Sequence, residues 1–166
     1  MEYISLNEAR FINLSKNFML DEFIKSETAL KFGINNDMPI HYVDRLKFLA
    51  TTVLQPIRDK FGPIRVTSGW RTPELAPYAN SNTRSNHSSA FAADIEPLNK
   101  DVKLSDIALY ISRELQFKEL IAEYLPVGWI HVAAENGNNI KQRKIKEYNK
   151  DYILKDKNSF EEYLRS

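Results

Sequence analysis

The sequence predicts an α+β fold in which a small antiparallel sheet carries helices packed on one side. Two patterns support this fold class. Apolar residues recur at three- and four-residue steps in the first 61 residues, whereas short β-branched or apolar segments follow from residue 64 onward, interrupted by one helical pattern. With 166 residues, 43% of them hydrophobic, the chain is most simply a single domain, 1–166, that buries its own core.

Two helices are expected in the first third of the chain. The first spans Asp21 to Phe32 and stops at Gly33. The second runs from about His41 to Phe61, and Pro56 should kink it or end its regular part. Residues 1–17 are expected to form a short strand or helix on the outside. The apolar face of the second helix comprises Val43, Leu46, Leu49, Ala50, Val53, Leu54 and Ile57.

The strands are expected later in the chain. Ile64–Thr67 alternates and is β-branched, and Phe91–Ile95 reads as a short buried strand. Lys118–Tyr124 and Trp129–Ala134 have the pattern of two hairpin strands. Between Phe91–Ile95 and the first hairpin strand, the apolar residues of Leu104–Leu115 have the spacing of a helix.

The remaining segments are turns, loops and a tail. Thr72 and Pro73 are typical of the cap and first residue of a short helix, Thr72–Leu75. Asn80–Ser89 is a polar loop, and Asn136–Asn139 is a turn. The charged tail should pack back on the domain through Ile145, Tyr148, Tyr152, Ile153, Phe160 and Leu164.

Composition narrows the class of protein. A net charge of +1 indicates no nucleic-acid or anionic membrane partner, and no apolar run approaches the roughly 18 residues of a membrane span. The N-terminus lacks a basic region followed by an apolar run, so no signal peptide is expected. Without cysteine, any metal site must use imidazole and carboxylate ligands.

Three such ligands are candidates for a catalytic zinc site. Two of the three histidines, His87 and His131, flank Asp94, which sits among apolar residues where a buried charge needs a partner. A zinc ion held by these three side chains would meet that need, and so would Arg71. His131 by itself is also compatible with a hydrogen-bonded structural histidine. His41 begins a helix and is interpreted as structural.

An ordered set of motifs adds to this interpretation. Trp129-x-His131 follows three earlier motifs: Ser68-Gly69-Trp70-Arg71, Ser85-x-His87 and His87-x6-Asp94. Together they resemble the zinc D-alanyl-D-alanine peptidase family, whose fold is shared with hedgehog signalling domains. Upstream, Asn17–Phe23, Ser26-x-Thr28-Ala29 and Gln55–Arg58 are similar to the branch common in bacteriophages and their hosts. The resemblance covers roughly residues 14–135 and leaves 136–166 as an extension.

The resemblance implies specific roles. His87, Asp94 and His131 would bind one zinc ion. Arg71 would lie beside the metal and bind the scissile carbonyl oxygen, where it would stabilise the developing oxyanion. Ser85 would help to hold the substrate, and Trp129, which shares a face with His131 by alternation, is a further candidate for substrate binding.

Two positions depart from the family pattern. Ala90 stands where glycine is usual, which would be strained if the position requires a positive φ. Gly128 stands three residues before the last histidine, where many members carry the catalytic carboxylate.

Glu123 is therefore the candidate general base. A three-residue hairpin loop, Pro126–Gly128, would place it opposite His131, with Cβ atoms ~5 Å apart. A two-residue loop would place Ala122 there instead and turn Glu123 away. Glu135 is the reserve candidate.

The expected activity is hydrolysis of a peptide bond in bacterial peptidoglycan stem peptides, by a D-Ala-D-Ala carboxypeptidase or an endopeptidase such as a phage endolysin. The alternative is an inactive zinc-binding structural or recognition domain, such as a virion component. A third reading is a metal-free module in which Asp94 pairs with Arg71. We expect a monomer that is made in the host cytoplasm and reaches the cell wall after release or as part of a virion.

Overall fold

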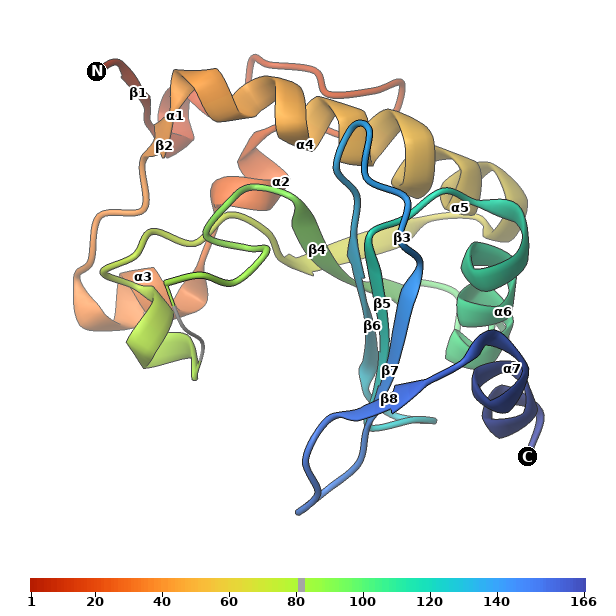
Figure 1. The fold of residues 1–166 in the computed structure, drawn as a ribbon. Helices are drawn as coiled ribbons and strands as arrows, with labels where there is room; N and C mark the ends of the chain where they lie inside the picture. Colours follow the sequence, from red (N-terminus) through yellow and green to blue (C-terminus); the bar gives the residue numbers. More distant parts are fainter. Residues whose placement is uncertain (81–82) are drawn as a thin grey trace.

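The computed structural model describes residues 1–80 and 83–166. A mixed sheet of six strands lies at the centre of the fold (Figure 1). The strand order is β3-β4-β6-β5-β7-β8, and every neighbouring pair is antiparallel except β5 and β7. The predicted α+β class is confirmed, although the larger sheet is mixed. The strands of this sheet are β3 (Ile64–Ser68), β4 (Ala92–Pro97), β5 (Glu119–Glu123), β6 (Trp129–Ala133), β7 (Gln142–Lys146) and β8 (Ile153–Lys155). A separate antiparallel pair consists of β1 (Tyr3–Ile4) and β2 (Met38–Pro39).

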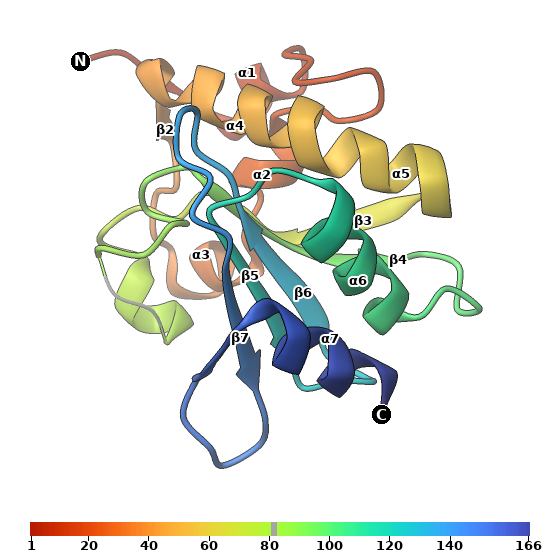
Figure 2. The same cartoon turned by 45° about the vertical axis from the view of Figure 1, so that its right-hand side comes forward.

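Helices cover one face of the sheet. Figure 2 shows α6 and α7 side by side, with α6 against the central strands and the α4–α5 rod running along the top of the molecule. None of the helices in the described ranges combines the length and apolarity that a membrane crossing requires. The helices are α1 (Leu6–Ala9), α2 (Asp21–Ile24), α3 (Glu27–Phe32), η1 (Ile40–Tyr42), α4 (Val43–Leu49), η2 (Ala50–Leu54), α5 (Gln55–Phe61), η3 (Ala76–Ala79), α6 (Leu104–Glu114) and α7 (Lys157–Arg165).

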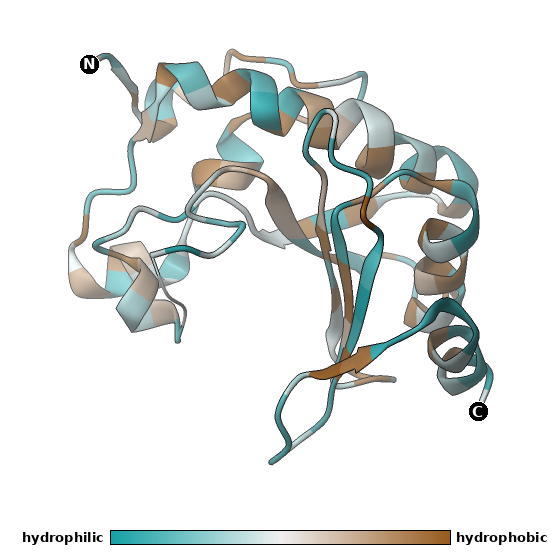
Figure 3. Cartoon of the chain, in the orientation of Figure 1, coloured by the Kyte–Doolittle hydropathy of each residue, from teal (hydrophilic) through white to brown (hydrophobic). Residues whose placement is uncertain are grey.

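The alternation of the strands separates the two faces of the sheet. Leu120, Ala122, Ile130 and Val132 point toward the helices and are fully buried. Figure 3 shows this apolar content in β5 and β6, whereas β7 is mostly hydrophilic. The opposite face carries the other residues of the same strands, and it is there that the polar side chains gather.

The predicted helix from Asp21 to Phe32 is two helices, because the chain leaves the helical conformation at Lys25, with ψ of 130°. The Ser26 hydroxyl then accepts a hydrogen bond from the backbone N–H of Ala29 at 3.2 Å and caps α3. A serine that satisfies a free N–H at a helix start offers a local alternative to continuing the first helix. Gly33 ends α3 as predicted, with φ of 63°.

The second predicted helix forms one unbroken helical segment from Ile40 to Phe61. Its irregularity lies at Ala50–Leu54, a wide π turn directly before Pro56. Proline lacks the N–H that would complete the ordinary ladder and its ring crowds the preceding turn, so a local widening is a common response. The predicted effect of Pro56 therefore appears one turn earlier than the residue itself.

The segment after β3 differs from its prediction. Thr72 caps a turn, with its hydroxyl accepting from the N–H of Leu75 at 3.3 Å, but the helical turn η3 begins only at Ala76. Of the predicted loop Asn80–Ser89, residues 81–82 lie outside the described part of the chain.

The C-terminal segment adds two strands to the sheet and one helix to the layer that covers it. β7 pairs with β5, β8 pairs with β7, and α7 packs on α6. Of the predicted anchors, Ile145, Phe160 and Leu164 are buried. The prediction is wrong for Tyr148, Tyr152 and Ile153, which are exposed because they belong to the loop and strand after β7, at the outer edge of the sheet (Figure 1).

The β5–β6 hairpin has a longer connection than either loop considered from the sequence. Five residues, Tyr124 to Gly128, link the strands, so Ile121 pairs with His131 and Glu123 pairs with Trp129. The prediction that Glu123 lies directly opposite His131 is wrong, and so is the alternative that places Ala122 there. Alternation nevertheless keeps Glu123 on the same face as His131, two residue pairs further along the ladder.

Gly128 closes this connection at a point where no side chain fits. Its N–H donates to the carbonyl of Tyr124 at 2.9 Å, and a Cβ at this position would lie 1.8 Å from the carbonyl oxygen of Glu123. The backbone of this hairpin connection therefore leaves no room for a carboxylate side chain at position 128.

We predict that Gly128→Ala lowers the free energy of unfolding by about 2 kcal/mol, because the new methyl group overlaps backbone that cannot move independently. Urea denaturation followed by circular dichroism measures this loss. Gly33→Asn is the control, since Gly33 ends a helix in open space with a left-handed conformation that asparagine tolerates. A Gly128→Ala protein as stable as the control would contradict this account of the hairpin.

Candidate metal centre

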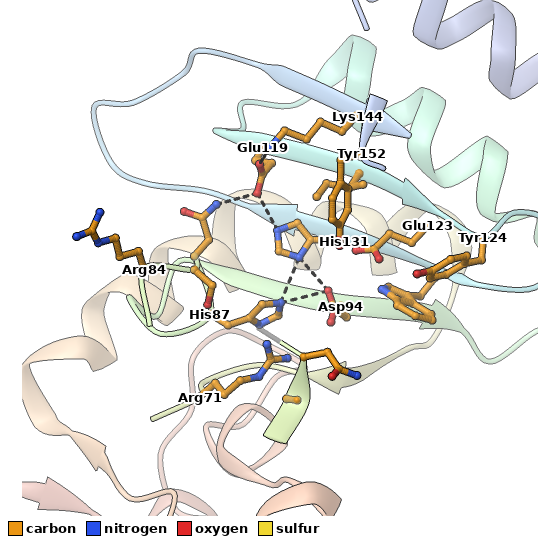
Figure 4. A pocket seen from close by; sticks show the side chains of 16 residues that line it. Arg71, Arg84, His87, Asp94, Glu119, Glu123, Tyr124, His131, Lys144 and Tyr152 are labelled. Carbon is orange, nitrogen blue, oxygen red and sulfur yellow. Dashed lines mark hydrogen bonds and ion pairs between the residues drawn. The ribbon is translucent and has the colours of Figure 1, made fainter. Parts of the chain in front are cut away.

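Two neighbouring strands and one loop bring the three predicted ligands together. Asp94 on β4 is the direct pairing partner of His131 on β6, so both side chains leave the sheet on the same face. His87 reaches them from the loop before β4 (Figure 4). The three side chains offer one ligand atom each, all within 4.8 Å of one another.

The donor atoms of this cluster converge closely. His131 Nδ1 lies 2.9 Å from Asp94 Oδ1, and His87 Nε2 lies 3.3 Å from the same oxygen. The two histidine nitrogens are 3.2 Å apart. Tetrahedral zinc with bonds of about 2.0–2.1 Å separates its ligand atoms by roughly 3.3 Å. The three side chains therefore fit a zinc ion by donor type and by spacing.

The carboxylate of Asp94 makes this cluster favourable for positive charge. Burial by itself would raise the pKa of Asp94, but the electrostatic effect of His87 and hydrogen bonds with both histidines hold it well below its usual range. Burial lowers the pKa of His131, whereas its close contacts with the carboxylates of Asp94 and Glu119 outweigh burial and raise that pKa to about 9. A buried carboxylate thus draws positive charge to this point, either as protons or as a metal.

A backbone carbonyl orients His87. Its Nδ1 lies 2.7 Å from the carbonyl oxygen of Gly69, which can only accept, so Nδ1 carries the hydrogen and Nε2 presents its lone pair to the cluster. Gly69 is held against α2, where a Cβ would lie 2.6 Å from the Phe23 carbonyl oxygen. The adjacent N–H of Trp70 donates to that oxygen at 2.7 Å. The glycine of the Ser68–Arg71 motif therefore allows the close approach that places the carbonyl for His87.

The turn that carries His87 has a strained residue. Ala90 adopts φ of 58°, the left-handed region in which the family glycine would be unstrained. Its N–H donates to the carbonyl of His87 at 3.1 Å, which closes the turn. A left-handed alanine costs roughly 1–2 kcal/mol, so the surrounding contacts must hold it there.

The cluster lies in a cleft of about 820 Å³ that also contains the other predicted site residues. Arg71 donates to the Ser68 hydroxyl at 2.8 Å; its burial lowers its pKa, and the charges of Asp94 and Glu123 act in the opposite direction. The Ser85 hydroxyl accepts from the N–H of Ser88 at 3.2 Å. The cleft-lining residues include Arg71, Arg84, Ser85, His87, Asp94, Glu119, Ile121, Glu123, Tyr124, Trp129, His131, Lys144 and Tyr152.

Glu123 is a buried carboxyl group in the same cleft, with only 6% of its surface exposed. Burial and, next, the negative charge of Asp94 raise its pKa to about 7, against the effects of His131 and Trp129. The indole N–H of Trp129 lowers that pKa by its proximity but completes no well-aligned hydrogen bond. A carboxyl group that titrates near neutrality beside a metal cluster has the properties of a general acid–base.

The alternatives weighed from the sequence lie elsewhere. Glu135 pairs with Lys118 at 2.8 Å and is outside the set of residues lining the cleft. His41 packs edge-on against Tyr42, with ring centroids 4.3 Å apart. Asp94 contacts the two histidines, while Arg71 bonds Ser68, so the geometry favours the histidine cluster over an Asp94–Arg71 pair.

Sequence reasoning missed two residues that support the site. The buried amide of Asn36 donates to the carbonyls of Ile24 and Trp70 and accepts from the N–H of Thr72, at 2.8, 3.2 and 3.0 Å. It thereby holds the segment that carries Arg71. Glu119 contacts His131, and the alternation that pointed to Glu123 also placed Glu119 on the same face.

Comparison with known proteins agrees with this geometry. Residues 16–133, well over half of the chain, match the family described as Peptidase M15. A search of curated proteins gave no match. The matched range contains the three clustered ligands, Arg71 and Glu123, whereas β7, β8 and α7 lie beyond it. The chain therefore belongs to the peptidase M15 family of zinc metallopeptidases.

Proposed function

We propose that this protein hydrolyses a peptide bond in bacterial peptidoglycan stem peptides, with one zinc ion held by His87, Asp94 and His131. The observation that carries the proposal is the combination, in one cleft, of three convergent buried donors and a carboxyl group whose pKa is about 7. A metallopeptidase requires both a metal site and a group that moves protons near neutral pH.

Zinc bound at these ligands would supply a water molecule of lowered pKa, ~7, and would polarise the substrate carbonyl. The chain's own residues do the rest. Glu123 accepts the proton of the attacking water and passes it to the leaving amine, because its buried carboxyl group changes protonation state at little cost near neutrality.

Arg71 is assigned to the developing oxyanion. Its guanidinium lies in the cleft and is anchored by Ser68, which limits the reorganisation needed when negative charge appears on the carbonyl oxygen. Ser85 and Trp129 line the same cleft and are assigned to substrate binding. Ser85 offers a hydroxyl, while Trp129 offers an aromatic face that packs against Tyr124 with ring centroids 5.2 Å apart.

The substrate assignment follows from the family and from the shape of the cleft. An open cleft of about 820 Å³ has room for a peptide, and the peptidase M15 family acts on peptidoglycan-type substrates. We propose either a carboxypeptidase or an endopeptidase, working as a phage endolysin that reaches the wall from the host cytoplasm after release. The proposed form is a monomer.

The competing function is an inactive zinc-binding structural or recognition domain, such as a virion component. It rests on the absence of a carboxylate at Gly128. Glu123 lies in the cleft on the same face as His131, so the site contains a carboxyl group even though residue 128 is glycine.

We predict that the purified protein binds one equivalent of zinc and releases stem-peptide fragments from peptidoglycan. Chelation should stop the release and added zinc should restore it. His131→Ala removes one of three ligands and should abolish both zinc retention and activity. Metal analysis and mass spectrometry of digested cell wall measure the two properties. Full zinc occupancy without any fragment release would favour the inactive domain.

Glu123→Gln should lower kcat by about 10²–10⁴-fold while zinc occupancy stays at one equivalent, because the amide keeps the shape but cannot accept a proton. Glu135→Gln is the matched control, since that carboxylate lies outside the cleft, and it should leave kcat unchanged. Activity retained in Glu123→Gln would dismiss Glu123 as the base.

The pH profile gives a separate prediction. A base works only when ionised, and burial raises the pKa of Glu123 to about 7. Activity should therefore rise with pH along an acidic limb whose midpoint lies below about 7, because bound zinc adds positive charge nearby and lowers the pKa of Glu123. Measurements of kcat/KM from about pH 5 to 8 test this, and a flat profile would contradict it.

A further inference from the structure

The second nitrogen of His131 needs a hydrogen-bond acceptor. His131 turns Nδ1 toward Asp94 and His87, at 2.9 and 3.2 Å. For Nδ1 to present a lone pair to a metal, the hydrogen of the neutral imidazole must reside on Nε2. That atom is buried and lacks a well-aligned hydrogen bond, and among the described residues one carboxylate lies within ion-pair distance of it.

Glu119 supplies that carboxylate. Its Oε1 lies 3.2 Å from His131 Nε2, on the side of the ring opposite the metal cluster. Glu119 pairs with Ala133 on β6, which places it diagonally beside His131 on the same face of the hairpin (Figure 4).

Two donors hold the Glu119 carboxylate in this position. Asn86 Nδ2 donates to Oε1 at 2.9 Å, and Lys144 Nζ donates to Oε2 at 2.6 Å. Asn86 directly precedes His87 in the chain, so Glu119 contacts one candidate ligand and the immediate neighbour of another. Such a carboxylate restrains both histidines at once.

Lys144 comes from a part of the chain that the family match does not include. It lies on β7, beyond residue 133, and the parallel register pairs it with Ile121 on β5. This pairing sends the lysine side chain to the face that carries the metal cluster. The strand therefore contributes a charge next to the site in addition to covering the edge of β5.

We propose that Glu119 is a positioning residue that keeps the hydrogen of His131 on Nε2 and its lone pair on Nδ1, and that Asn86 and Lys144 hold Glu119 for this task. The inference rests on the zinc site of the proposed function. Carboxylates that accept a hydrogen bond from a ligating histidine raise its basicity and fix its orientation, and their loss typically weakens metal affinity by 10–100-fold.

The test measures zinc dissociation constants by competition with a chromophoric chelator, without any assay of activity. Glu119→Ala should bind zinc about 10–100-fold more weakly than the wild type. Glu119→Gln should bind more tightly than Glu119→Ala, because its amide oxygen still accepts from Nε2. Lys144→Met should weaken binding by a smaller factor, since Glu119 stays but loses one of its two donors.

Glu135→Ala is the matched control. Glu135 is also held by a lysine and an asparagine, Lys118 at 2.8 Å and Asn138 at 3.0 Å, but it lies outside the cleft. Removing it deletes a comparable ion pair and should leave the zinc dissociation constant unchanged. Circular dichroism of each protein verifies that the variants are folded.

The outcomes separate this inference from the proposed function. Zinc bound by Glu119→Ala as tightly as by Glu135→Ala would overturn the role of Glu119, and so would a Glu119→Gln variant no better than Glu119→Ala. A wild-type protein that does not bind zinc would instead overturn the proposed function, and this inference with it.

Discussion

The pairing of Asp94 with His131 across β4 and β6 is the constraint on which the site depends. Facing residues in an antiparallel pair share a side of the sheet, and a slip of one residue would send one of them into the apolar layer beneath the helices. The fully buried Ile95, Ile130 and Val132 resist such a slip because they would become exposed. The hydrophobic core therefore sets the register that brings a carboxylate and an imidazole together, away from most solvent.

Around this pair, the second nitrogen of each histidine faces an oxygen atom from another part of the chain. His87 donates to the Gly69 carbonyl, and that carbonyl is in place because Gly69 lies against the backbone of Phe23 on α2. His131 faces Glu119, which Lys144 reaches from β7. The N-terminal helices and the C-terminal strand thus support opposite sides of one small cluster. Elements far apart in the chain influence which nitrogen of each ring carries a lone pair.

The hairpin between β5 and β6 excludes a side chain at position 128 but carries a carboxyl group elsewhere on the cleft face. The backbone at Gly128 lies against the Glu123 carbonyl, which leaves no space for a side chain there. The same strand carries Glu123 on the cleft face, where burial and the charge of Asp94 raise its pKa to about 7. A carboxyl group on a strand is held more rigidly than one on a loop, which suits the role of general base that we propose for Glu123.

Local patterns in the sequence were sufficient for the α+β class and most element positions, because periodicity and alternation are properties of neighbouring residues. The candidate ligands His87, Asp94 and His131 came from an ordered set of motifs that resembles a known family, and the face of Glu123 depended on an assumed length of the hairpin loop. Tertiary structure decided the rest. The five-residue connection placed Ile121 opposite His131, and the parallel pairing of β7 with β5 brought Lys144 to Glu119. Loop length and strand order depend on contacts between distant segments, such as the closeness of Gly128 to Glu123, and no local pattern encodes them.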